Sequence, residues 1–593
     1  MNLGKKLTFW GALAMPFRLT PVATILGLIN SLMDIAIAPI KLLVTAYFIN
    51  TALTVVTEGQ DARRIVLPLV AMAAFSVYGY ITGPLSSLIK RHKAIKTRLL
   101  LRMPFVEKRV KLEYKHMENR ETVDLLNRAL NDPEAQLGDI YNFVMAIVQD
   151  TAITISTMVI LIVNAPLVGI VLLALSVPML WLAFKSGKAN YQAMKDTVID
   201  QRYAGNFDWL LNDRNTAAER NMFGFSGFLS KKFFHHYEKG RKHRLKTEMS
   251  WWSRQKISGI LMVLLSAASL FIMVPAVASG ALSVGLFIAL QGALFTAVKI
   301  CSGNLPFWFM RLTQKMEHLK DVNAFLALSE VEGAEALPTT PPVDFETLEF
   351  RNVSFTYPGT EKVILDNLSL LIEKGKHYSF VGVNGAGKTT LTKLMTRLYD
   401  DYTGEILLNG KELREWAMAD IKSCFCVLFQ DFARYDITVA ENVAIGKING
   451  ATDAEIDDAL EKSGFEKTAT ELKDGKDTLL GKTHEDGIDL SGGQWQRLAF
   501  ARAIISPAAV KILDEPTAAL DPVAESQVYA QFESISQDFT TIFISHRLAS
   551  AKLADTIFVL DGGKVVEAGN HETLVAAKGI YADMFESQQS WYL

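Results

Sequence analysis

A glycine-rich segment that ends in Lys-Thr-Thr carries the clearest chemical signal in the sequence. Residues 378–390 read YSFVGVNGAGKTT, in which a buried-strand pattern runs into a Gly-x-x-x-x-Gly-Lys-Thr loop and a helical pattern follows. In such a loop backbone N–H groups surround phosphates, Lys388 reaches the β- and γ-phosphates, and Thr389 can ligate Mg²⁺. This context is rare by chance, so we expect a nucleoside triphosphate to bind here.

Two adjacent acids follow a second buried-strand pattern. Residues 509–516 read AVKILDEP, so Asp514 and Glu515 come where the apolar run ends. Parallel strands end at one edge of a sheet, which places both acids beside the phosphate loop. We expect Asp514 to hold Mg²⁺ through water, and Glu515 to orient or deprotonate the attacking water. The alternative, two solvated acids at a strand end, is weakened by the Lys-Thr loop.

A third segment, LSGGQWQRLAF at 490–500, begins a helical pattern with residues that are poor helix formers. Ser491 is expected to cap this helix. The N-terminus of a helix carries a partial positive charge and free N–H groups, so it suits an anion. The segment alone does not say which molecule brings that anion.

These segments require an α/β domain to position them, and the first half of the chain is of another kind. Of the 593 residues 50% are hydrophobic, and the net charge of −2 gives no reason to expect nucleic acid as a partner. The hydrophobic residues concentrate before about residue 310. Six apolar runs are each near or above the ~20 residues that a membrane span needs, at 21–50, 65–89, 141–163, 167–184, 257–279 and 284–305.

The connections between these runs predict the topology. The first run reads as a retained anchor, and residues 2–18 suit a helix on the membrane surface. The two long connections are rich in Lys and Arg, which places them and both termini in the cytoplasm. We expect helical extensions with tips near 113–123 and 214–223 that meet another part of the protein, although solvated hairpins are the alternative.

Several polar and sulfur-containing side chains in the chain have open roles. Asp34, Lys41, Asp150 and Lys299 lie within the apolar runs, where charges usually face a cavity or a partner. Snorkelling to a headgroup, or a structural Asp–Lys pair, explains them equally well. The three cysteines, Cys301, Cys424 and Cys426, are expected to be reduced and packed rather than metal-binding.

We therefore predict a multi-domain fold. An α-helical membrane domain with six transmembrane helices and long cytoplasmic extensions spans 1–328. A Pro-, Glu- and Thr-rich linker covers 329–344, and an α/β P-loop ATPase domain covers 345–593.

The ordered set of motifs resembles the ABC transporter superfamily, and nearly the whole chain resembles an exporter-type half-transporter. Beyond the segments above, the matches are Tyr357 in FTYPG, Gln430 in LFQDF, Asp521 in AALD and His546 in FISHR. The resemblance implies catalytic roles for Glu515, His546 and Gln430. It implies ATP contacts at Tyr357, Asn384, Gly385, Gly387, Lys388, Thr389, Thr390, Ser491, Gly492, Gly493, Gln494 and Asp521, and Mg²⁺ contacts at Thr389, Gln430 and Asp514.

The resemblance also implies a partner subunit and a transport cycle. In the family, the residues equivalent to Ser491–Gly493 bind the γ-phosphate of an ATP seated on the other subunit, so a homodimer or a related heterodimer is expected. Two positions depart from the family pattern: Trp495 stands where Arg or a similar polar residue is more common, and His484 where many exporters have glycine. Both departures concern coupling more than ATP binding.

The resemblance leaves the transported molecule open. The FQDF-x-[KR]-Y start of residues 429–446 is similar to exporters of modified peptides, so peptide export through the cell membrane is the leading hypothesis. Export of lipids or hydrophobic drugs, and import of a metal chelate, remain alternatives. ABC-type DNA-repair ATPases lack six spans, and a gated channel or sensor on the same frame would show no ATP-dependent uptake in vesicles.

Overall fold

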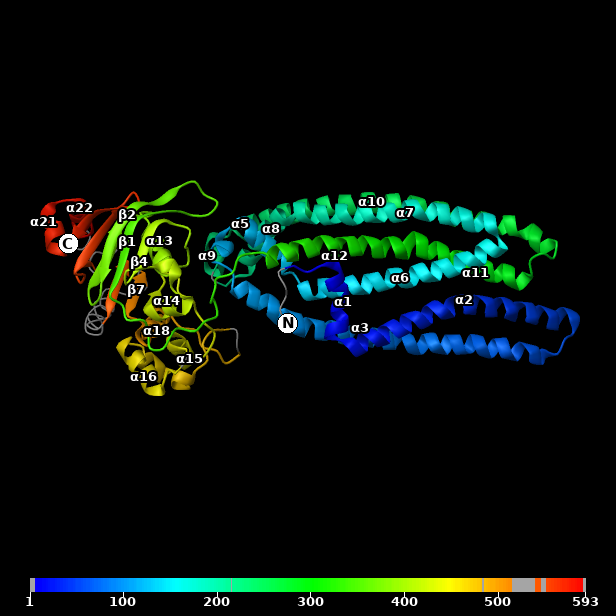
Figure 1. Ribbon diagram of the computed structural model, residues 1–593, viewed down its shortest axis with the longest axis horizontal. Coiled ribbons are helices and arrows are strands. Elements are labelled where there is room, and N and C mark those ends of the chain that lie inside the picture. The colour runs from blue at the N-terminus through cyan, green and yellow to red at the C-terminus, as the bar shows by residue number, and fades with distance from the viewer. Residues whose placement is uncertain are drawn as a thin grey trace. The chain divides into compact units, whose positions relative to one another are not determined.

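A computed structural model describes residues 6–214, 216–448, 450–482, 485–514, 539–544 and 551–589 of the chain (Figure 1). The chain divides into two compact units. The first, which we call the helical unit, contains Met1–Arg109 and Arg120–Leu328. The second, the α/β unit, contains Ser329–Leu593 together with the short segment Val110–Asn119.

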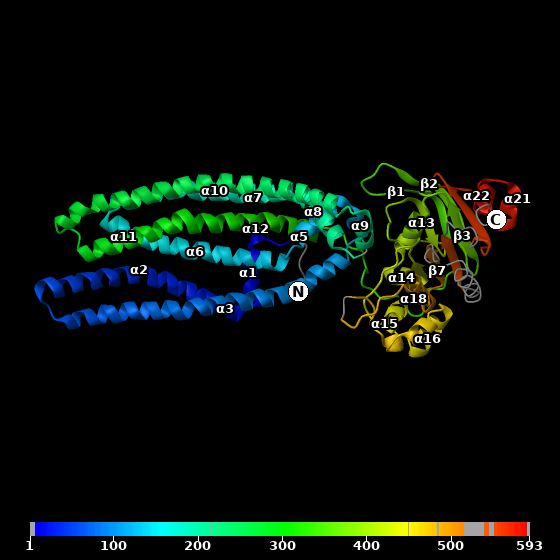
Figure 2. The ribbon, with the colours of Figure 1, turned by 180° about the vertical axis from the view of Figure 1, so that it is seen from behind.

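The helical unit is a set of long helices that lie alongside one another (Figures 1 and 2). Its α-helices are α1 (Phe9–Leu19), α2 (Pro21–Glu58), α3 (Val66–Val110), α5 (Arg120–Ala129), α6 (Pro133–Asn164), α7 (Pro166–Asp196), α8 (Val198–Asn212), α9 (Ala217–Phe223), α10 (Ser226–Ala278), α11 (Val284–Lys299) and α12 (Leu305–Leu326). A 3₁₀ turn (Ala62–Ile65) precedes α3, and a π-helical turn (Ile300–Asn304) joins α11 to α12.

Six stretches of this unit are long and apolar enough to cross a membrane, as the sequence predicted. Only 6% of the most apolar 18-residue stretch of α2 is buried within the chain. The apolar side chains of α2 therefore require cover from lipid or another protein. The 45 residues of α3 and the 53 residues of α10 correspond to about 68 and 80 Å at 1.5 Å per residue. Both exceed a ~30 Å hydrocarbon core, so the expected helical extensions are present.

Close helix packing in this unit depends on small residues and caps. Ser283 caps α11 by accepting a hydrogen bond from Leu286 N. A Cβ on Gly285 would lie 2.3 Å from the Ala46 carbonyl oxygen of α2, so only glycine allows this approach. The Gly285 N–H also donates to Asn50 Oδ1 of α2 at 2.8 Å. These contacts join the last span to the first.

The α/β unit contains two sheets. The antiparallel sheet has the order β2-β1-β4-β5, and the second sheet has the order β10-β9-β3-β8-β7-β6, parallel except for β10. The strands are β1 (Thr347–Thr356), β2 (Val363–Glu373), β3 (His377–Gly382), β4 (Thr403–Leu408), β5 (Lys411–Glu412), β6 (Phe425–Leu428), β7 (Val510–Asp514), β8 (Thr540–Ile544), β9 (Thr556–Asp561) and β10 (Lys564–Gly569).

Helices cover these sheets and form a separate lobe. The α-helices described in this unit are α4 (Lys115–Glu118), α13 (Lys388–Met395), α14 (Met418–Cys424), α15 (Val439–Ala444), α16 (Asp453–Lys462), α17 (Glu466–Glu471), α18 (Gly492–Ile504), α21 (His571–Ala577) and α22 (Ile580–Gln589). The lobe of α15 to α18 has its own apolar core.

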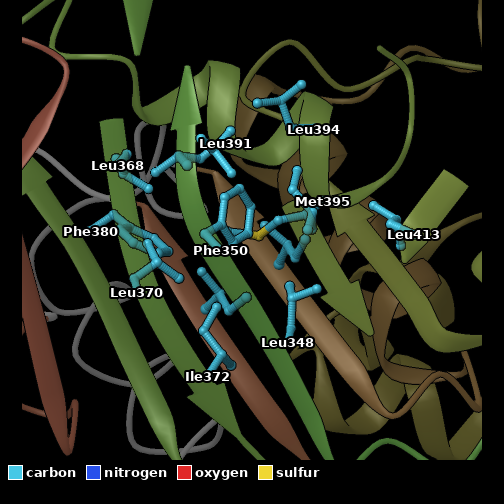
Figure 3. Packing of buried hydrophobic residues seen from close by; sticks show 14 of the residues in the cluster. Leu348, Phe350, Leu368, Leu370, Ile372, Phe380, Leu391, Leu394, Met395 and Leu413 are labelled. Carbon is cyan, nitrogen blue, oxygen red and sulfur yellow. The ribbon is translucent and has the colours of Figure 1, made fainter. Parts of the chain in front are cut away.

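The main core lies between the two sheets and α13. Figure 3 shows Phe350 of β1 and Leu370 of β2 facing Leu391 and Met395 of α13. The core also buries Cys424 completely, and this burial raises the pKa of its thiol to about 12. The core anchors α13, the helix that follows the glycine-rich loop.

Candidate functional site

The glycine-rich loop connects β3 directly to α13, as the sequence predicted. Gly387 caps α13 with φ 103°, and a Cβ there would lie 2.6 Å from Leu365 Cδ2. A Cβ on Gly382 would lie 2.2 Å from the Leu560 carbonyl oxygen. Lys388 is buried, and its ammonium donates to the carbonyls of Gly382 (2.7 Å) and Val383 (3.2 Å). The lysine is thereby held over the loop at a helix N-terminus, where an anion is stabilised.

The sheet register brings the other expected groups to the same edge as this loop. Asp514 ends β7 opposite Ile544 of β8, and Phe380 of β3 pairs with the same Ile544. Strand β6 ends one pair earlier, at Leu428 opposite Leu513, so Gln430 follows two residues beyond it. Asp514 is buried, whereas Thr389, Asn384 and Gly385 are exposed on the loop side of this edge.

Tyr357 is attached to the phosphate-loop helix. Its hydroxyl is 3.0 Å from Thr390 Oγ1, a buried group on α13. Its ring packs edge-on against Tyr399, with centroids 5.4 Å apart. The proposed adenine-stacking residue and the proposed phosphate-binding helix are therefore positioned together. Glu515, Asp521 and His546 lie outside the described residues, as does His484.

A cation next to Tyr357 was missed by the sequence reasoning. The Lys393 ammonium of α13 lies 5.2 Å from the ring centroids of Tyr114 and Tyr357 and 5.9 Å from that of Tyr399. It also pairs with the Glu118 carboxylate at 2.7 Å, and the Tyr399 hydroxyl donates to the same carboxylate. The local helical pattern LTKLMTRL does not predict this partner of Lys393, because Glu118 is distant in the chain.

The electrostatics of this cluster favour a charged Glu118. Burial raises the pKa of its carboxyl, but the hydrogen bonds from Lys393 and Tyr399 outweigh burial and hold the pKa below its usual value. Burial likewise lowers the pKa of Lys393, whereas Glu118 and the neighbouring tyrosines raise it to a net value above normal. The ion pair is therefore fully formed at neutral pH.

The segment Val110–Asn119 belongs to the α/β unit through further contacts. His116 Nε2 is 2.8 Å from Ser329 Oγ, and the Glu113 N–H donates to the Ser329 carbonyl at 3.3 Å. Lys115 lies 3.4 Å from the Asp401 carboxylate. Residues 113–118 of the first expected tip, near 113–123, thus contact other residues of the α/β unit.

The third segment begins α18, and Ser491 caps that helix as predicted. Ser491 Oγ accepts from Gln494 N at 3.3 Å, and Gln494 Oε1 accepts from Ser491 N at 2.8 Å. Gln494 is therefore half of a capping box. Trp495 is 1% exposed within the core of the helical lobe, so this departure from the common pattern fills a core position.

Polar side chains inside the spans also form a network. Asp34 of α2 accepts hydrogen bonds from the Tyr78 hydroxyl of α3 (3.1 Å) and the Gln149 amide of α6 (3.1 Å). Asp150, the next residue of α6, accepts from Trp308 Nε1 of α12 at 3.0 Å. Both carboxylates thus have neutral donors from other helices.

The chain is similar to known proteins in its α/β unit and along most of its length. Residues 365–518 match the family described as ABC transporter. Over 554 residues, 93% of this chain and 89% of the relative, the chain is 28% identical to the subtilin transport ATP-binding protein of Bacillus subtilis. The chain thus contains an ABC transporter domain and is similar over most of its length to a bacterial ABC-type transport protein. The match lies within the α/β unit, which therefore carries the ATPase domain that binds ATP in ABC transporters.

Two further comparisons add to this similarity. The chain is 37% identical over 284 residues to an ATP-dependent lipid A-core flippase of Pseudomonas fluorescens, an alignment that spans 46% of this chain and 47% of the flippase. Its fold resembles that of a bacterial Atm1-family ABC exporter with ATP bound, with a TM-score of 0.78 and 22% identity over 95% of this chain and 98% of the other. The expected fold class, an α-helical membrane domain joined to an α/β P-loop domain, is confirmed.

Proposed function

We propose that this chain is one protomer of a dimer that exports an amphipathic peptide across the cell membrane. The observation that carries the proposal is the relationship with the subtilin transporter, which covers 93% of this chain, whereas the lipid A flippase alignment covers 46%. Lipid or multidrug export is the second candidate, because the flippases are 37–40% identical over their shorter alignments. Import of a metal chelate by the same architecture is the third.

The proposed ATP site uses the loop and the sheet edge described above. Lys388 neutralises charge on the β- and γ-phosphates, and Tyr357 stacks on adenine. The buried Asp514 carboxylate, the Thr389 hydroxyl and the Gln430 amide are hard oxygen donors at one edge, which is the donor set that Mg²⁺ prefers. Bound Mg²⁺ would neutralise charge on the phosphates. Glu515 orients or deprotonates the attacking water, and His546 contacts the γ-phosphate.

The proposed partner completes this site. Ser491–Gly493 begin a helix in the lobe that has its own core, separate from the core beneath Lys388. Ser491 and Gly492 are exposed. They are therefore available to the γ-phosphate of an ATP seated on a second subunit, with Gln494 fixing the helix start. Asp521 is proposed to contact ATP as well. We propose a homodimer with two ATP molecules between its ATPase domains.

Movement is coupled to ATP through the tips of the helical extensions. Val110–Asn119 forms one compact unit with the ATPase domain. At the second tip, Met222 and Phe223 of α9 are 84% and 74% exposed, an apolar pair that requires a partner surface. We propose that this surface is the partner's ATPase domain. The ATPase domain and both termini then lie in the cytoplasm, in keeping with the Lys- and Arg-rich connections.

The Asp34 network supports a substrate with polar or cationic groups. Its three members come from α2, α3 and α6, and each carboxylate oxygen of Asp34 accepts from a neutral donor. A carboxylate within a membrane span usually serves a pathway or a partner. A peptide with amino groups offers such a partner, whereas a purely apolar drug does not.

The test is ATPase activity and transport by the purified chain in proteoliposomes, with no second gene product present. Homodimer function predicts basal Mg²⁺-dependent turnover. Peptide export predicts stimulation and uptake with cationic amphipathic peptides rather than with lipids or dyes, in inside-out vesicles. Stimulation by lipid A or dyes alone would replace the peptide assignment with the second candidate. Turnover without any uptake would support the channel or sensor alternative.

A further inference from the structure

A pocket of about 270 Å³ lies between α1, α3 and α6 of the helical unit. Its lining includes Pro16 of α1, Lys90 and Lys93 of α3, and Asn142 of α6. The apolar run of α3 ends at residue 89, so Lys90 is the first charged residue after the membrane-spanning part. The pocket therefore lies at the depth where lipid headgroups are expected.

Lys93 is a buried cation that forms no ion pair with a carboxylate among the described residues. It is 8% exposed. Its contacts among the described residues are a long hydrogen bond to Asn142 Oδ1 at 3.4 Å and the Tyr141 ring, whose centroid lies 4.4 Å from the ammonium. Both partners are neutral, and the other lysine of the lining adds a like charge. Burial of a charge is unfavourable unless an opposite charge accompanies it, so the site favours an anion.

The acids of the pocket already have other cations. Glu134 accepts from Arg98 at 3.4 Å, and Asp139 pairs with Lys315 at 3.0 Å. These pairs leave the positive charge of the two lining lysines uncompensated. A small anion that bound beside them would supply the missing charge.

The apolar surroundings indicate which kind of anion this is. Pro16, Ala94 and Ile95 also line the pocket, and Ile95 is exposed. Trp10, on the same short helix as Pro16, is exposed as well, and aromatic side chains of this kind favour the membrane interface. An anion with an apolar body fits this mixture of walls better than a free ion does.

We propose that this pocket binds the phosphate of an anionic phospholipid, with Lys93 and Lys90 as its ligands and the apolar wall against the glycerol and acyl chains. In the orientation proposed above, this lipid belongs to the cytoplasmic leaflet. Binding of the lipid does not depend on transport or on the exported molecule, so it can be tested separately from the proposed function.

The test measures lipid retention by the full-length chain purified in a neutral detergent. Phosphatidylglycerol or phosphatidylcholine is added, and retained lipid is read by native mass spectrometry together with the midpoint of thermal unfolding. The Lys90→Gln/Lys93→Gln variant is compared with an Arg91→Gln/Lys96→Gln variant, which removes the same charge from exposed positions of α3 outside the pocket.

The wild type and the control are expected to retain phosphatidylglycerol, and the pocket variant to lose about fivefold in affinity for each lysine removed. Equal losses in both variants would mean that surface charge alone attracts the lipid, and would overturn the proposal. Millimolar glycerol phosphate is expected to give no thermal shift. If it reproduced the shift of phosphatidylglycerol, the site would be one for a soluble anion instead.

Two single variants keep the test decisive if the double variant does not fold. Lys90 is exposed, so Lys90→Gln leaves the packing intact and is expected to weaken phosphatidylglycerol binding alone. Lys93→Arg keeps the charge and is expected to retain the lipid. Unchanged binding in Lys90→Gln would contradict the proposal.

Discussion

The Lys393 ammonium lies 2.7 Å from the Glu118 carboxylate, although 275 residues separate the two in the chain. Lys393 belongs to the helix that follows the phosphate loop, and its ammonium also lies over the Tyr357 ring. The pair therefore links the proposed nucleotide site to the segment Val110–Asn119.

Glu118→Gln is expected to loosen that segment without removing the ATP site. The pair is partly exposed, so its loss should cost about 0.5–1 kcal/mol of unfolding free energy. We expect faster hydrogen exchange in residues 110–119 and weaker stimulation of ATPase activity by substrate, with basal turnover retained. Asp344→Asn is the matched control, because it breaks an exposed pair with Lys374 elsewhere in the unit. Equal exchange in wild type and Glu118→Gln would contradict the assigned role.

The contribution of Glu118 is expected to depend on pH. Its pKa in the folded protein lies below the usual value. Stabilisation by a carboxylate with a lowered pKa is fully present above the unfolded pKa of about 4.3, and is lost as pH falls through the folded pKa. The difference in stability between wild type and Glu118→Gln should thus be constant near neutral pH and shrink below about pH 4. Urea unfolding at several pH values measures this difference, and a difference that grew towards acid would have the wrong sign.

Two variants separate ATP binding from hydrolysis. Lys388→Ala removes the cation over the phosphate loop, and we expect binding of a fluorescent ATP analogue to fall sharply. Glu515→Gln is expected to bind ATP normally and to form a stable dimer, while turnover falls roughly 10²–10⁴-fold because general-base assistance is lost. Turnover at the wild-type rate in Glu515→Gln would show that another group activates the water.

Trp495→Ala should destabilise the helical lobe by about 3–5 kcal/mol, because it removes a large side chain from a packed core. Thermal unfolding checks this value. We expect ATPase activity to be lost while Lys388 still binds nucleotide, since Trp495 of α18 and the phosphate-loop helix α13 pack in separate cores. Trp416→Ala, at a partly buried tryptophan beside the main core, is the control and should cost less.

Phe223→Asp is expected to uncouple ATP hydrolysis from transport. The side chain is 74% exposed, so the change should leave folding intact. In proteoliposomes basal ATPase activity should persist, while ATP-dependent uptake falls by an order of magnitude or more. Met117→Asp, at an exposed methionine of the first tip, allows comparison of the two tips. Normal uptake in Phe223→Asp would exclude this tip from coupling.

Local patterns in the sequence were sufficient for much of the fold. Six spans, the strand-loop-helix at Lys388 and the capped helix at Ser491 depend on hydropathy, glycines and caps within a few residues. The edge that joins Asp514 to the loop follows from the parallel register. Such features are set by neighbouring residues or by simple sheet geometry, so they can be predicted from a single sequence.

Contacts between distant segments were not predictable in this way. Neither the hydropathy nor the spacing of residues 110–119 pairs Glu118 with Lys393, or Tyr114 with Tyr399. The proposed domains of 1–328, 329–344 and 345–593 follow the order of the chain, whereas the compact units place Val110–Asn119 with Ser329–Leu593. Likewise, the two residues that donate hydrogen bonds to Asp34 come from other helices. These are Tyr78 and Gln149. Side-chain pairs of this kind arise only when tertiary packing brings the helices together.

The segment Val110–Asn119 also has a consequence for biogenesis. The ribosome completes Glu118 275 residues before Lys393, a delay of tens of seconds at ordinary rates of synthesis. During that delay Tyr114 and Glu118 have no surface to join, and a nascent chain in this state is a natural client for chaperones. Maturation of the transporter should therefore be limited by the late arrival of its own C-terminal half.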